Sequence, residues 1–587
     1  MVIPEARLKF FRRARALKAL CAGDVTAPKR LALAVLWRWQ EITYPALTQF
    51  ARRPYGTSHF LADPAVLGFA EWLADNTSFN VAAYWLATAY AIWVGEAERA
   101  KCSLYFTPPR LSERVIDDLV GEGASLADAS WHDPACGGAA FLMPVAQRVS
   151  RALVARGHPA RAVIRHIQKN VTGSDLDETL LELSEQFLRM ALYDLIVLSK
   201  DLPDFELVHG DGLLTTTSER RPDIVICNPP YRKLKAADVE GYSDEYAAVI
   251  EGQPNIYGLF IHRSIQMAKL GGLVGLLTPT SYLSGQYFSK LRVELLNRAG
   301  PLRIDMLSGR TSTFIDVEQE TAITILRTRE PKEVDRWSVN VSVRTKDDEF
   351  EDVGQCVLPT CGRPWPIPKS VDDVPLLKAA EASTVRLSSY GYQAKIGQLV
   401  DYRDERKRYA EPPMSLHGRT VFPLVWATDI APKGVFSHGR RRRGDKHELY
   451  VKTVADEQSC VVRRPAVVMQ RVTSTDQPRR LVCAAVPQKW MAMHKGFVAE
   501  NHVLVIEQAI EGTPAFDPET LAAVLRSATV DRLFRSISGA ANVSVFELNQ
   551  VPMPHAEVVL RELKLGRDIE SAILKGYGLL APSAKAA

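Results

Sequence analysis

The segment Asn228-Pro229-Pro230-Tyr231 combines residue types suited to chemistry on an amine. It follows an apolar run, 223–227, and its two prolines remove two backbone donors and restrict the chain. Backbone carbonyls and the Asn228 amide oxygen remain as hydrogen-bond acceptors, and the Tyr231 ring offers a flat face. Acceptors on both hydrogens of an amine conjugated to a heteroaromatic ring draw its lone pair toward an electrophilic methyl group. The segment therefore predicts a methyl-transfer site on such an amine, with a rigid turn as the alternative.

A turn of small residues precedes a predicted helix at residues 132–142. Small side chains let a ligand approach the backbone closely. A helix N-terminus can hold phosphate, but the carboxylate of Asp133 would repel it. The turn instead favours a cationic ligand such as the amino group or sulfonium of S-adenosylmethionine, although a plain tight turn is an alternative. The residues expected to contact that cofactor here are Asp133, Ala135, Cys136 and Gly137.

Two further acids, Asp175 and Asp211, end the next two predicted strands. A carboxylate at the end of a second strand typically accepts hydrogen bonds from ribose hydroxyls. One at the following strand can accept a bond from an adenine amine. Each alone could be a helix cap or a solvated residue, but their succession after the small-residue turn predicts nucleoside contacts.

Between residues 100 and 330, short apolar runs alternate with helical stretches. This rhythm predicts an α/β fold with a mostly parallel, doubly wound, Rossmann-like sheet. Ligands bind at the carboxyl ends of the strands in such sheets, where the turns described above fall. The expected strands lie within 171–175, 205–211, 223–228, 272–279 and 321–326.

Three regions are predicted. Residues 1–95 are rich in Ala, Leu and Trp and are expected to be helices packed on the next domain. Residues 96–375 form the predicted catalytic domain. A proline cluster around Trp365 suggests a linker, and residues 376–587 form a second domain of mixed α/β character that carries Arg440, Arg441, Arg442 and Arg443 between two glycines. That run predicts phosphate contact or an exposed loop.

The composition is ordinary for a globular protein, with 46% hydrophobic and 24% charged residues and a net charge of +5. That charge permits a nucleic-acid partner without requiring one. No long uncharged apolar stretch is present, so no membrane span is expected, and the charged N-terminus does not resemble a secretory signal. Eight scattered cysteines without a CxxC pair favour a reducing, cytoplasmic setting and no structural metal.

By the order of these motifs, residues 100–330 resemble the adenine-specific class I DNA methyltransferases of the gamma arrangement, the group that includes the TaqI methyltransferase. The resemblance implies that residues 105–109 form the leading cofactor motif, with Tyr105, Thr107 and Pro108 as contacts. It identifies Asp133–Gly137 as the glycine-rich motif, although Ala139 stands where the family has a second glycine. That methyl group is tolerated if φ is negative and strains the turn if φ is positive. The long spacing from Asp133 to Asp175 implies an insertion.

The resemblance also assigns function to the individual motifs. Asp175 becomes the ribose-binding acid and Asp211 the acid that meets the cofactor adenine. Asn228-Pro229-Pro230-Tyr231 becomes the catalytic motif, and Phe314 matches an aromatic residue that stacks on an extruded base. The implied activity is transfer of a methyl group from S-adenosylmethionine to N6 of an adenine flipped out of double-stranded DNA.

The C-terminal region resembles the family's target-recognition domain at residues 470–474, 501–502 and 538–554. The arrangement resembles the PstI type, which implies the modification enzyme of a restriction-modification system with a separately encoded endonuclease as a partner. Base contacts are made by side chains that reach the major groove. The candidates are Arg471, Thr473 and Arg480, of which Arg480 could equally contact phosphate.

Several alternatives remain open from the sequence. Asn-Pro-Pro-Tyr also occurs in methyltransferases acting on protein glutamine and on RNA, and a cytosine-N4 enzyme has similar chemistry. Glu405-Arg406-Lys407 fits half of a nuclease site, as a fused restriction-methylation enzyme would require, but it has no matching Pro-Asp upstream. A DNA-binding subunit without catalytic activity is the alternative outside the enzymes.

Overall fold

The computed structural model describes residues 4–50, 53–102, 104–215, 220–307, 320–334, 336–440, 447–454, 459–473, 477–538 and 542–579. The chain divides into two compact units. The first comprises residues 1–282, 287–351 and 360–362. The second comprises 283–286, 352–359 and 363–587. Among the described helices, none is both long and apolar enough to cross a membrane.

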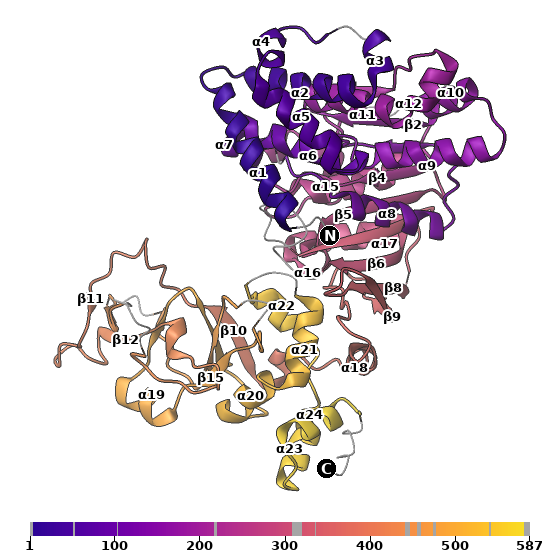
Figure 1. Cartoon of the computed structure of the whole chain (residues 1–587). Coiled ribbons are helices and arrows are strands. Elements are labelled where there is room, and N and C mark those ends of the chain that lie inside the picture. Colours follow the sequence, from indigo (N-terminus) through magenta and orange to yellow (C-terminus); the bar gives the residue numbers. More distant parts are fainter. Residues whose placement is uncertain are drawn as a thin grey trace, which may run out of the picture. The chain divides into compact units, whose positions relative to one another are not determined.

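The first unit begins with helices, as the Ala- and Leu-rich composition predicts. Apolar residues dominate α2 and α6, so both helices are buried along most of their length. They contact α11 of the sheet domain (Figure 1). The helices of this segment are α1 (Pro4–Lys18), α2 (Ala27–Thr43), α3 (Pro45–Phe50), α4 (Ser58–Leu61), α5 (Pro64–Asn76), α6 (Phe79–Val94) and α7 (Glu96–Cys102).

Strands of the first unit form one sheet in the order β3-β2-β1-β4-β5-β7-β6-β8. The pairs from β3 to β5 are parallel, whereas β7 is antiparallel to both β5 and β6. The strands are β1 (Trp131–Asp133), β2 (Val171–Asp175), β3 (Leu207–His209), β4 (Ile224–Cys227), β5 (Leu273–Pro279), β6 (Ala299–Leu307), β7 (Thr321–Thr328) and β8 (Trp337–Arg344). The mostly parallel, doubly wound sheet predicted from the apolar runs is confirmed.

Helices connect these strands and cover the sheet. They are α8 (Pro109–Gly121), α9 (Leu142–Ala155), α10 (Ala160–Asn170), α11 (Glu178–Ala191), α12 (Tyr193–Ser199), α13 (Ala236–Glu240), α14 (Ser243–Tyr246), α15 (Ile256–Met267), α16 (Ser281–Ser284) and α17 (Ser289–Arg298). Two helices, α9 and α10, lie between β1 and β2. The insertion predicted from the spacing of Asp133 and Asp175 is therefore an additional helix.

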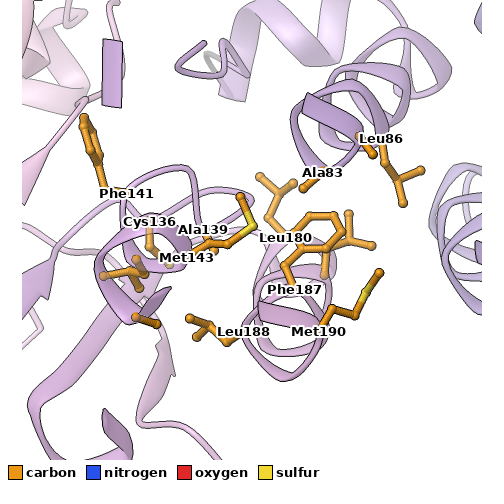
Figure 2. Packing of buried hydrophobic residues seen from close by; sticks show 14 of the residues in the cluster. Ala83, Leu86, Cys136, Ala139, Phe141, Met143, Leu180, Phe187, Leu188 and Met190 are labelled. Carbon is orange, nitrogen blue, oxygen red and sulfur yellow. The ribbon is translucent and has the colours of Figure 1, made fainter. Parts of the chain in front are cut away.

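One hydrophobic core joins the N-terminal helices to the sheet domain. Figure 2 shows Ala83 and Leu86 of α6 facing Leu180 and Phe187 of α11. A Cβ atom on Gly138, in the turn after β1, would lie 2.9 Å from the Cβ of Ala87 in α6. The N-terminal helices thus pack directly on the small-residue turn, and they belong to the same compact unit as the sheet.

The second unit has two four-stranded sheets, with orders β10-β17-β14-β15 and β11-β13-β12-β16. Strand β9 (Phe350–Leu358) crosses the boundary between the units. The remaining strands are β10 (Tyr392–Ile396), β11 (Arg408–Tyr409), β12 (Val421–Val425), β13 (Tyr450–Lys452), β14 (Ala466–Gln470), β15 (Cys483–Ala485), β16 (Val498–Ala499) and β17 (Val503–Gln508). The helices are α18 (Asp373–Glu381), α19 (Gln488–His494), α20 (Pro518–Leu525), α21 (Ala528–Ile537), α22 (Val545–Gln550), α23 (Ala556–Lys564) and α24 (Ile569–Gly576).

A buried charge cluster joins α8 to β6 in the first unit. The Asp305 carboxylate, 0% exposed, accepts hydrogen bonds from Arg114 at 2.6 Å and Arg303 at 2.8 Å. Asp118 of α8 lies beside them, 3.1 Å from Arg114. Burial and the neighbouring Asp305 carboxylate raise the pKa of Asp118 above its usual range. Asp118 therefore holds its proton to a higher pH in the folded chain than in the unfolded chain.

We expect Asp118→Asn to weaken the dependence of stability on pH. Above about pH 4 an unfolded aspartate is ionised, so folding binds a proton at Asp118 and the free energy of unfolding falls as the pH rises. The uncharged amide of the variant removes this contribution. Thermal unfolding between pH 5 and pH 8 should show a smaller decline for Asp118→Asn than for the wild type. Asp347→Asn, at an exposed carboxylate, is the control, and equal slopes for Asp118→Asn and the wild type would contradict the assignment.

Candidate active site and cofactor site

The predicted site residues converge because they follow neighbouring parallel strands. Asp133 ends β1, Asp175 ends β2, Asp211 follows β3 and Asn228 follows β4. Strand order in the sheet reverses between β1 and β4, and ligands bind at the carboxyl ends of strands beside such a switch point. The sheet thus brings the acids and the Asn-Pro-Pro-Tyr segment to one edge.

The turn after β1 is fixed by hydrogen bonds to Asp133 and Asp175. The buried Asp133 carboxylate accepts from Ala135 N at 3.0 Å. Gly137 N donates to Asp175 Oδ2 at 2.9 Å, and Asp177 N donates to Asp175 Oδ1 at 2.9 Å. Burial raises the pKa of Asp133 to about 8 and that of Asp175 to about 6. The carboxylates therefore order the turn, and a cation bound here would favour their charged forms.

Ala139 adopts a left-handed backbone conformation, with a φ of +54°, beside Gly137 at +52°. A non-glycine residue in this region is strained by about 1–2 kcal/mol. The sequence predicts that the Ala139 methyl group is tolerated if φ is negative. Because φ is positive, the turn is strained at this residue. The Ala139 methyl group is 0% exposed and packs in the core of the first unit (Figure 2), which offsets part of the strain.

Asp211 is held by a residue that sequence reasoning did not identify. Its Oδ2 accepts a hydrogen bond from Tyr242 Oη at 2.6 Å, and its Oδ1 accepts from Leu213 N at 2.9 Å. Next to it, a Cβ atom on Gly212 would lie 1.9 Å from the carbonyl oxygen of Pro134. Only glycine fits there, so the loop after β3 approaches the turn after β1 backbone to backbone. No signal in the sequence identified Tyr242 or the close approach at Gly212.

The Asn-Pro-Pro-Tyr segment is tied to Thr107 of the segment 105–109. Asn228 Nδ2 donates to Thr107 Oγ1 at 2.9 Å, and Tyr231 Oη lies 2.5 Å from Asn228 Oδ1 and 2.9 Å from the Leu277 carbonyl oxygen at the end of β5. Both Asn228 and Tyr231 are partly exposed, whereas Thr107 is 2% exposed. Thr107, predicted as a cofactor contact, thus orients the Asn228 amide.

The rest of the leading motif also lies at this site. A Cβ atom on Gly137 would be 3.6 Å from the Phe106 ring, so Phe106 packs against the turn after β1. Tyr105 is partly exposed and lies near Arg99, whose guanidinium carbon is 5.8 Å from the ring centroid. Pro108 begins α8. The family resemblance predicted that this segment lies at the site, whereas the Thr107–Asn228 hydrogen bond carried no sequence signal.

Other predicted residues lie elsewhere. Phe314 and Arg441, Arg442 and Arg443 fall outside the described residues. Arg440 is exposed, and Arg471 is partly exposed. Arg480 and Thr473 are 0% and 1% exposed and bond to each other at 3.0 Å. Their burial corrects the expectation that these two side chains reach DNA, because the structure gives them a packing role.

The described residues include no group of three or more His, Cys, Asp or Glu side chains placed to hold a metal ion. The groups available to a ligand at the strand ends are the carboxylates that follow three neighbouring strands and a turn of small residues. That set fits an adenosyl cofactor with a cationic centre, since carboxylates can accept from ribose hydroxyls and an adenine amine and can balance positive charge.

Comparison with known proteins identifies methyltransferases that are similar to this chain. A family model described as Eco57I restriction-modification methylase matches residues 161–314. The type II methyltransferase M.BsuBI of Bacillus subtilis is 24% identical over 427 residues, covering 68% of this chain and 80% of that protein. M.PstI of Providencia stuartii is 23% identical over 373 residues, covering 60% of this chain and 69% of that protein.

A solved structure shares the fold. That of MmeI, a type IIL restriction-modification enzyme in complex with DNA, has a TM-score of 0.52 at 10% identity and covers 95% of this chain and 88% of that one. The chain is thus similar to methylases of type II restriction-modification systems. Its first unit has a Rossmann-like fold, and the strand-end carboxylates fit S-adenosylmethionine as the cofactor.

We expect Gly212→Ala to weaken binding of S-adenosylmethionine by at least about tenfold, since a misplacement of about 1 Å is costly at such sites. The added methyl carbon would lie 1.9 Å from the Pro134 carbonyl oxygen, so the loop that carries Asp211 must move away from Pro134. Isothermal titration of the purified chain with S-adenosylmethionine measures the effect. Gly210→Ala is the matched control, because its Cβ would meet only the Thr215 hydroxyl, at 3.1 Å. Equal affinities for the two variants would contradict the close-approach argument.

Proposed function

We propose that this chain is a site-specific DNA methyltransferase that modifies N6 of adenine and serves as the modification enzyme of a restriction-modification system, with a separately encoded endonuclease as partner. Support comes from the type II methyltransferases to which the chain is related. The resemblance of its motif order to the gamma arrangement supports adenine as the target base.

The observation that carries the proposal is the fixed Asn228 amide at the switch point of the sheet. Thr107 accepts from its Nδ2 at 2.9 Å, which directs its Oδ1 toward Tyr231. An amide oxygen has two acceptor sites, so Oδ1 can accept from Tyr231 and from an incoming amine together. Pro229 and Pro230 have no N–H to compete for that amine. The segment can therefore accept both amine hydrogens and align the lone pair.

S-adenosylmethionine supplies an electrophilic methyl group on its sulfonium. The side chains of this protein position the amine, so no strongly basic residue is required at the nitrogen. A base inside a duplex is out of reach, and flipping it out costs a few kcal/mol. We assign the faces that stack on the flipped base to Tyr231 and Phe314, each contact being worth about 1–3 kcal/mol.

The second unit is proposed as the target-recognition part. Arg440 and Arg471 are exposed or partly exposed and carry charge suited to DNA phosphates or base edges. The neighbouring Arg441, Arg442 and Arg443 are assigned to phosphate contact. We propose three parts along the chain. They are a helical region at 1–95, the methyltransferase domain at 96–375 and a DNA-recognition domain at 376–587.

The function is tested by the product. The chain and S-adenosylmethionine are incubated with unmethylated double-stranded DNA, and the nucleosides are identified by mass spectrometry. We expect N6-methyladenine at a single sequence motif by long-read sequencing. Asn228→Ala should bind S-adenosylmethionine normally yet lose activity by about 10²–10³-fold, as happens when one positioned polar group is removed. N4-methylcytosine, or methylation of RNA or protein without DNA, would refute the assignment, and so would an active Asn228→Ala protein.

Two variants separate the hydroxyl of Tyr231 from its ring. Tyr231→Phe removes the contacts of the hydroxyl with Asn228 and Leu277 and keeps the flat face, so we expect kcat to fall about five- to tenfold, the effect of one hydrogen bond. Tyr231→Ala also removes the face and should lower kcat further. Single-turnover methylation measures both. Full activity of Tyr231→Phe would show that the hydroxyl does not orient Asn228.

A further inference from the structure

A buried carboxylate holds an exposed histidine at one edge of the second unit. Glu500 and His502 lie in the turn between β16 and β17, and their side chains are 2% and 57% exposed. Glu500 Oε1 lies 2.6 Å from His502 Nδ1, and Glu500 Oε2 accepts from His502 N at 2.9 Å. Both oxygens of one buried carboxylate therefore bind one residue.

This pairing determines how the imidazole is presented. A carboxylate oxygen only accepts, so Nδ1 of His502 carries a proton. Among the described residues, no side chain or backbone group bonds to Nε2 of His502, and its ring is largely exposed. An acceptor atom brought to Nε2 favours a second proton there, and the Glu500 carboxylate balances the charge that results. The turn thus presents Nε2 of an oriented imidazole to solvent.

Three chain segments meet beside this histidine. Arg471 N donates to the His502 carbonyl oxygen at 2.8 Å, and Arg471 Nη1 donates to the Asn501 carbonyl oxygen at 3.0 Å. Val472 is 50% exposed and forms a β-bridge with the exposed Asn542. We call the group Arg471, Val472, His502 and Asn542 the turn surface. It combines a guanidinium, an imidazole, an amide and an apolar side chain, a mixture suited to phosphates and base edges of DNA.

We propose that His502, oriented and charge-balanced by Glu500, is a direct DNA contact that donates from Nε2 to an acceptor atom of the DNA, either a phosphate oxygen or the N7 or O6 of a guanine. This proposal rests on the proposed function, because it requires that DNA is the substrate. His502 is the binding residue, and Glu500 is a positioning residue. The competing explanation is that Glu500 only stabilises the turn.

DNA binding of the full chain tests the proposal. Fluorescence anisotropy with a labelled duplex, repeated over a series of salt concentrations, compares the wild type with His502→Ala and Glu500→Gln. His555→Ala, at another exposed histidine of the second unit, is the matched control. We expect His502→Ala to raise Kd about tenfold, the effect of one hydrogen bond to a charged group. A phosphate contact also lowers the salt slope by about one, whereas a base contact relaxes the methylated motif.

Glu500→Gln keeps an oxygen that can accept from the turn and removes the charge. We expect it to raise Kd about as much as His502→Ala without lowering the melting temperature. If Glu500 only stabilises the turn, His502→Ala will bind DNA like the wild type at every salt concentration, and Glu500→Gln will change only the melting temperature. Either result overturns the proposal while the methylation of DNA still stands. A wild-type chain that binds no DNA would overturn both.

Discussion

The close approach of the loops at the carboxyl edge of the sheet is the constraint on which the site depends. Gly137 N–H reaches the Asp175 carboxylate, and Gly212 packs against the Pro134 carbonyl with no room for a Cβ atom. These contacts join the loops after β1, β2 and β3 into one body. The carboxylates of Asp133, Asp175 and Asp211 are far apart in the sequence, and they can face a single ligand because the three strands are parallel and adjacent. The backbone contacts then set the distances among the loops.

That body is supported from outside the sheet by the N-terminal helices. Helix α6 touches the turn at Gly138 through Ala87, and the same helix packs on α11. The turn also contains Ala139 at a positive φ. Strain of this kind persists only where the surrounding packing holds it, and the buried position of the Ala139 methyl group in a continuous core supplies that packing. The helical region is therefore part of the same compact unit as the sheet.

Charge in the second unit is used in two different ways. The Arg480 backbone N–H binds buried Asp531 at 2.6 Å and its guanidinium bonds Thr473, so this arginine is a core residue. His502 stands outside on a buried carboxylate, and its ring faces solvent. Both residues form hydrogen bonds with a buried carboxylate, Asp531 for Arg480 and Glu500 for His502. The two pairs differ because the Arg480 side chain is buried and the His502 ring is exposed, and the spacing of residues in the sequence does not predict this difference.

The sequence by itself determined the order of the motifs, five of the strands and the strand ends where the motifs lie. The apolar run within 223–228 became β4 because a strand buried on both faces needs a continuous run of apolar residues. Small residues at 135–138 marked the turn for a similar local reason.

Tertiary structure alone decided the partners. The bonds Thr107–Asn228 and Tyr242–Asp211 join residues 121 and 31 positions apart, and no local preference specifies which hydroxyl meets which amide or acid. It also decided that Arg480 is buried while His502 is exposed. Burial depends on what packs over a side chain, and that is a property of the assembled core and not of the residue type.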